Sequence, residues 1–171
     1  MVYDAARKRH VLFGSQFTDD PHVWAYDLRK NEWRDLRPDS LPPTNRKDAV
    51  LASDSLNQVV IAVVKVTQGE GEKTKHRLET WSFSAGKDKW TKMNPPQEPG
   101  PGGNRTRVLA FAPELGLTLL ENCTHPPHAP REQQIWTYRF ANPRPGPSQH
   151  PEPASDVRGT TFPEGAVLRW K

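Results

Sequence analysis

Hydrophobic and polar positions alternate along much of the chain, in short apolar stretches separated by turn residues. Side chains at positions i and i+2 of a strand lie on one face of a sheet, so this alternation predicts half-buried β-strands. The pattern is clearest between Asn45 and Lys92. There it predicts four strands, near Asp48–Ser53, Gln58–Val66, Leu78–Ser84 and Lys89–Lys92. We therefore expect an all-β fold.

Aromatic residues repeat along the chain with a nearly constant spacing. Trp24, Trp81 and Trp136 are 57 and 55 positions apart, and each is followed two positions later by another aromatic residue. In the first two copies a further tryptophan comes nine positions after the first, across a polar turn. The third copy has no such tryptophan. The repeated aromatic positions are Trp24, Tyr26, Trp33, Trp81, Phe83, Trp90, Trp136 and Tyr138.

The apolar stretches upstream of these aromatics repeat as well. "NRKDAVLASDSLNQVVIAVV" begins at Asn45, "NRTRVLAFAPELGLTLLEN" begins at Asn104, and "MVYDAARKRHVLFGS" matches the same pattern from its middle. The repeating unit is four short strands, and the three units cover about 1–40, 45–95 and 104–141. Four antiparallel strands in about 50 residues are typical of one blade of a β-propeller.

The first unit, "HVLFGS…VWAYDLRKNEWRDL", resembles a kelch repeat: an apolar strand, an aromatic-x-Tyr-Asp segment, a turn and Trp-x-x-Leu. The resemblance extends from Met1 to Phe140 and departs from the family at its double glycine, which is Gly14-Ser15 in the first unit. It implies a fragment of a kelch-type β-propeller with four-stranded antiparallel blades. Propellers usually have four to eight blades. We therefore expect further blades in a longer chain, or association of three-blade units.

The resemblance also gives the repeated aromatics a structural role. In kelch blades they pack between neighbouring sheets, so truncating Trp33 is expected to cost several kcal/mol, as for other buried tryptophans. The alternative is an exposed aromatic surface on which sugars stack.

The C-terminal part of the chain differs in composition. Residues 142–153 are rich in proline, which predicts a linker. The segment 154–171, "ASDVRGTTFPEGAVLRWK", resembles the start of a fibronectin type III domain, with a disordered tail as the alternative. Such a neighbour favours a multidomain protein that is exported or on the cell surface, although the first residues lack the apolar core of a secretory signal.

Charge and hydropathy exclude some classes of partner. The net charge is +4 and the isoelectric point is about 9.3, but the basic residues are dispersed. We therefore expect no nucleic-acid binding. No apolar stretch approaches the roughly 18 residues that span a membrane. One cysteine, Cys123, leaves no internal disulfide.

The long connections predicted within and between the units emerge at one end of the blades. Loops on a rigid scaffold are the usual place for binding, so we expect a non-catalytic scaffold that binds a protein or peptide there. Arg46 and Arg105 enter the innermost strands of their units. The resemblance implies that arginines at this position hold a carboxylate of the partner. The alternative is that each bonds carbonyls of its own loop.

Catalytic and metal chemistry have little support in the sequence. The stretch "NCTHPPHAP" brings Cys123, His125 and His128 together, with Glu132 beyond, but the spacing matches no zinc pattern. We expect a solvated loop, with no metal, cofactor or catalytic residue. The alternative function is a fragment of a carbohydrate-active or galactose-oxidase-like propeller enzyme, which the resemblance allows.

Overall fold

The computed structural model describes residues 1–14, 22–43, 49–69, 74–84, 86–100, 107–124, 132–140, 158–162 and 165–169. These residues contain thirteen strands and no helix, so the expected all-β class is confirmed. The strands are β1 Val2–Asp4, β2 Arg9–Phe13, β3 Val23–Asp27, β4 Glu32–Asp35, β5 Ala49–Asp54, β6 Val59–Gln68, β7 Lys75–Ser84, β8 Lys89–Lys92, β9 Arg107–Ala112, β10 Leu117–Thr124, β11 Glu132–Tyr138, β12 Arg158–Phe162 and β13 Gly165–Arg169.

The strands form antiparallel sheets in which neighbours in sequence are neighbours in space. Sheet 1 has the order β1-β2-β3-β4, sheet 2 has β5-β6-β7-β8, and sheet 3 has β11-β10-β9. β12 and β13 pair with each other as a hairpin. The resemblance of this tail to a fibronectin type III domain stays a prediction, because one hairpin does not define a domain. Within the described ranges no helix is long and apolar enough to cross a membrane.

Tight turns join consecutive strands, and several share one construction. An aspartate at the end of the first strand accepts hydrogen bonds from backbone amides of the turn, as Asp4, Asp27 and Asp54 do. The last turn residue then has the left-handed conformation that lets the chain reverse into the next strand. These left-handed residues are Lys8, Asn31, Gln58, Asp88 and Gly116, with φ between 48° and 60°.

Each sheet has two faces, which the strand register defines. We call the face that carries the repeated aromatics the aromatic face, and the opposite one the aliphatic face. In sheet 1, Tyr26 and Trp33 are paired on the aromatic face, whereas Val11 and Ala25 are paired on the aliphatic face. In sheet 3, Leu120 and Trp136 are paired on the aromatic face.

The sheets stack with aliphatic face on aromatic face. The core between sheets 1 and 2 is built from Val11, Phe13, Val23, Ala25 and Leu36 on one side and Val60, Ala62, Val64, Val66, Phe83 and Trp90 on the other. The core between sheets 2 and 3 is smaller. It brings Val63 and Leu78 of the aliphatic face of sheet 2 against Leu120, with Leu109 and Trp136 beside it. Both interfaces therefore use the same pair of faces.

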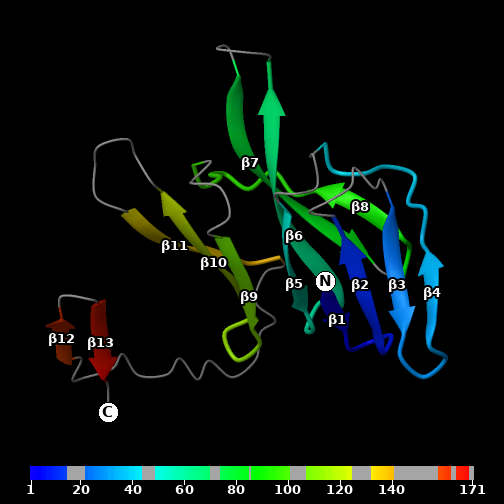
Figure 1. Cartoon of the computed structure of the whole chain (residues 1–171), viewed down its shortest axis with the longest axis horizontal. Coiled ribbons are helices and arrows are strands. Elements are labelled where there is room, and N and C mark those ends of the chain that lie inside the picture. The colour runs from blue at the N-terminus through cyan, green and yellow to red at the C-terminus, as the bar shows by residue number, and fades with distance from the viewer. Residues whose placement is uncertain are drawn as a thin grey trace.

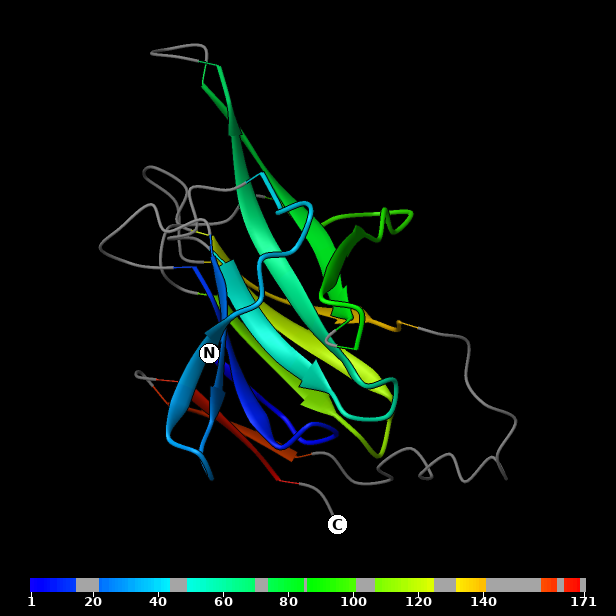
Figure 2. The same cartoon turned by 90° about the vertical axis from the view of Figure 1, so that its right-hand side faces the viewer.

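The first strands of the three sheets lie closest together. β5 contacts β9 and β1 contacts β5, and Figures 1 and 2 show β5 and β9 side by side. β4 and β11 lie toward opposite sides of Figure 1. The stack leaves two faces without a neighbouring sheet among the described residues. Tyr3 and Trp33 on the aromatic face of sheet 1 are 47% and 52% exposed, and Val108 and Ile135 on the aliphatic face of sheet 3 are 58% and 64% exposed.

Candidate binding site

The connections that sequence analysis singled out leave the stack at one end. β2, β6 and β10 all point toward the upper part of Figure 1, and β4 and β8 run in the same direction as β2 and β6 within their sheets. We call this end the loop end. Arg46 and Arg105, the predicted binding residues, lie outside the described residues, and so does part of each loop.

A long hairpin extends from sheet 2 at the loop end. β6 and β7 stay paired as far as Gln68 and Lys75, beyond the ends predicted from the sequence. The described tip of this arm, residues 67–69 and 74–77, projects past the other strands in Figure 1. Lys75, His76 and Arg77 are exposed, and the Nδ1 atom of His76 lies 3.0 Å from Oγ1 of Thr67. The arm thus presents polar and basic side chains on a regular backbone.

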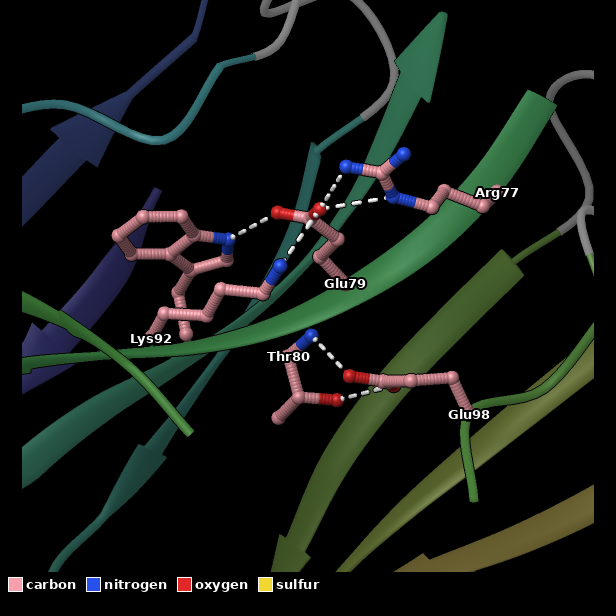
Figure 3. Close-up of polar contacts among 6 residues, drawn as sticks. Arg77, Glu79, Thr80, Lys92 and Glu98 are labelled. Carbon is pink, nitrogen blue, oxygen red and sulfur yellow. Dashed lines mark hydrogen bonds and ion pairs between the residues drawn. The ribbon is translucent and has the colours of Figure 1, made fainter. Parts of the chain in front are cut away.

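A buried carboxylate fixes the base of the arm (Figure 3). Glu79 is 2% exposed and accepts hydrogen bonds from Nε and Nη2 of Arg77, at 2.8 and 2.6 Å, and from Nζ of Lys92, at 2.8 Å. Nε1 of Trp81 donates a further bond of 3.1 Å. Burial raises the pKa of Glu79, but the donors on Lys92, Arg77 and Trp81 outweigh it and hold the pKa below its usual value. Glu79 is therefore an ionised structural group that joins β7 to β8.

The next residue along β7 points to the opposite face of sheet 2. The backbone amide and Oγ1 of Thr80 each donate a 2.8 Å hydrogen bond to the carboxylate of Glu98 (Figure 3). These two bonds hold the segment that follows β8 against the gap between sheets 2 and 3. The sequence does not indicate this pair, because nothing in the residue pattern relates positions that are 18 apart on different elements.

A hollow lies beside Glu98, between sheets 2 and 3. Burial raises the pKa of Tyr138, and the negative charges of Glu98 and Asp54 raise it further, so its hydroxyl stays protonated. The hollow has mainly apolar walls. Its lining is Ile61, Val63, Thr80, Pro95, Gln97, Glu98, Pro99, Leu109, Thr118, Leu120, Trp136, Thr137 and Tyr138.

The eight repeated aromatics differ in burial. Phe83 and Trp90 are buried between sheets 1 and 2. Trp24, Tyr26, Trp81, Trp136 and Tyr138 are half-buried.

The side chain of Trp33 is 52% exposed in this chain, so its expected packing between two sheets stays a prediction. Its ring centroid lies 4.9 Å from that of Tyr26, with the two rings tilted by 35°, but no sheet in the described part of the chain covers that face.

The cysteine–histidine loop falls largely outside the described residues. Cys123 is half-buried near the end of β10, whereas His125 and His128 are not described. Where the structure describes the chain, no three His, Cys, Asp or Glu residues are grouped closely enough to hold a metal ion.

The chain matches no model of a known protein family, and no curated protein matches it.

Proposed function

We propose that sheets 1, 2 and 3 are consecutive blades of a kelch-type β-propeller, and that the chain is a non-catalytic scaffold which binds a protein or peptide at its loop end. The support for the blade assignment is the repeated meander, the repeated pairing of aliphatic with aromatic faces, and the contact between first strands. Three blades are fewer than the four to eight that close a ring, so further blades come from a longer chain or a second copy.

The observation that carries the binding proposal is the arm at the loop end. Ten-residue strands β6 and β7 hold exposed polar side chains away from the stack, and the Glu79 cluster fixes their base. A surface that is already ordered loses little conformational entropy when a partner binds. Glu79 is engaged by donors from three residues, which suits a structural role better than a catalytic one.

The enzyme alternative has no specific observation in its favour among the described residues. Its chemistry would need a tyrosine directed at a metal site. The hydroxyl of Tyr26 instead donates a 2.7 Å bond to Asn31 in its own turn.

Panning a displayed library of random peptides against the purified chain tests the proposal. Enriched peptides are then titrated by fluorescence anisotropy against the double variant Lys75→Ala/His76→Ala on the arm. The matched control is Arg29→Ala/Lys30→Ala, which changes two exposed residues of the turn at the opposite end of sheet 1. We expect the arm variant to bind at least tenfold more weakly and the control to bind unchanged. Failure to enrich any peptide, or equal losses in the two variants, would contradict binding at the loop end.

A further inference from the structure

The outer edge of β11 differs from the outer edges of β3 and β7. In sheets 1 and 2 the outer edge of the third strand pairs with a fourth strand: β3 pairs with β4, and β7 pairs with β8. In sheet 3 the third strand is β11, and no strand in the described part of the chain pairs with its outer side. An unpaired edge presents backbone N–H and C=O groups that can bind another extended strand.

The side chains of sheet 3 repeat those of sheet 2 up to this edge. Phe83 of β7 is paired with Val60 of β6, and Tyr138 of β11 is paired in the same way with Thr118 of β10. Two residues before these aromatics, Trp81 and Trp136 occupy equivalent positions. The indole of Trp81 donates to Glu79 and that of Trp136 donates to Gln134, both at 3.1 Å and both two residues back along the strand.

The repetition stops at the tryptophan of the fourth strand. In sheet 2, Trp90 pairs with Phe83, and its ring lies 5.0 Å from that of Phe83 and 4.8 Å from that of Phe13 in sheet 1. At the interface of sheets 2 and 3, the residue equivalent to Phe83 is Tyr138 of sheet 3. By register, the residue equivalent to Phe13 is Val63 of sheet 2. Both line the hollow. The hollow therefore lies at the place that Trp90 fills one sheet earlier.

The chemistry of the hollow suits an aromatic side chain next to a basic group. Its walls are apolar apart from a few groups, and the carboxylate of Glu98 is bonded there by the neutral donors of Thr80. A carboxylate with neutral partners favours a cation or an indole N–H close by.

We propose that β11 binds an extended peptide from a partner, which adds as a fourth antiparallel strand and inserts a tryptophan into the hollow. The mode is β-strand addition, in which the backbone gives affinity and the pocket gives specificity. The segment that follows β11 is a poor candidate for this strand. Residues 142–153 include five prolines and no tryptophan, and proline cannot donate to the ladder. This site is on the edge of sheet 3 and does not depend on the loop end.

The chain contains a template for the ligand. β8 has the sequence Lys-Trp-Thr-Lys, which places a tryptophan between basic residues. The probe is therefore a fluorescein-labelled peptide that copies residues 86–94, GKDKWTKMN, titrated against the whole chain by fluorescence anisotropy. We expect saturable binding, and at least tenfold weaker binding of the same peptide with Trp90→Ala. This comparison uses the unaltered chain, so it does not depend on the folding of a variant.

Two changes in the chain locate the site. Thr118→Phe fills the hollow and Tyr138→Ala removes the ring on which the tryptophan would stack, so each should weaken binding at least tenfold. The control is Ile135→Thr, which changes a 64% exposed residue on the other face of β11 and should bind as the wild type does. Hydrogen exchange should slow at the amides of residues 132–138 when the peptide is present.

Three results would overturn the proposal. They are the absence of binding, equal affinity of the tryptophan and alanine peptides, and exchange protection that falls on β7 in place of β11. The last result would mean that the peptide displaces β8 from sheet 2.

Discussion

The ring of Trp90 in sheet 2 lies 4.8 Å from the ring of Phe13 in sheet 1, and both side chains are almost fully buried. This pair joins the outer part of one sheet to the middle of the next. Trp33 has the same place in the sequence repeat as Trp90, yet it is 52% exposed. Comparing the two tryptophans therefore separates the contribution of the sequence motif to stability from the contribution of burial.

Trp90→Ala should destabilise the chain by about 3–5 kcal/mol, because it leaves a cavity in the core between sheets 1 and 2. Trp33→Ala should cost less than about 1.5 kcal/mol, the contribution of an aromatic pair with little buried surface. Urea denaturation followed by circular dichroism measures both. Equal costs for the two variants would show that the exposed face of sheet 1 is covered in solution.

Glu79→Gln should destabilise the chain by about 1.5–3 kcal/mol at neutral pH, because it removes the charge that Arg77 and Lys92 bond. The folded state lowers the pKa of Glu79, so its charge stabilises the fold above the unfolded pKa of about 4.3. That contribution is lost as the pH falls through the lower, folded pKa. The stability difference between wild type and variant should therefore be full at pH 7 and shrink in acid. A difference that stays constant from pH 7 to pH 3 would contradict this account.

Thr80→Val should loosen the segment that follows β8. The substitution keeps the shape of the side chain but removes one of the two hydrogen bonds to Glu98, at a cost of about 0.5–3 kcal/mol. Hydrogen exchange of residues 93–100 should quicken, whereas Thr91→Val, at an exposed position of β8, should leave it unchanged. If neither variant changes the exchange rate, the backbone hydrogen bond from Thr80 to Glu98 is enough to hold the segment in place.

The two uncovered faces should make the chain associate head to tail. Exposed apolar patches on opposite sides of a stack give a heterologous contact, which can build rings or filaments. Light scattering should show a molar mass that rises with concentration. Trp33→Glu or Ile135→Lys should each lower it, whereas Leu56→Lys, in an exposed turn of sheet 2, should not. A monomer at every concentration would exclude this contact.

Much of the fold follows from residue patterns. In the second unit the predicted strands differ from β5 and β8 by at most one residue at either end. β6 and β7 run further than predicted, because a hydrogen-bonded ladder can continue through polar residues such as Gln68 and Lys75. A burial pattern marks where a strand meets a core, whereas it does not mark where pairing ends.

The binding features were harder to predict. The same Trp motif occurs at Trp33 and Trp90, and local sequence does not tell which face another sheet covers. The hollow is also invisible in the sequence, since its walls come from two sheets and from the segment around Glu98. The sequence shows that the third unit lacks a second tryptophan. Interpreting this difference required two structural features: the outer edge of β11, with which no described strand pairs, and the hollow beside it.

The stacking of aliphatic on aromatic faces gives the array a direction. A sheet inside the stack packs its aromatic face against one neighbour and its aliphatic face against the other. The stability of such arrays is roughly a sum of unit and nearest-neighbour terms. Gain or loss of one whole four-stranded unit would leave faces of the same two kinds in contact. A gene for such a chain can therefore grow or shrink by complete units without inventing a new interface.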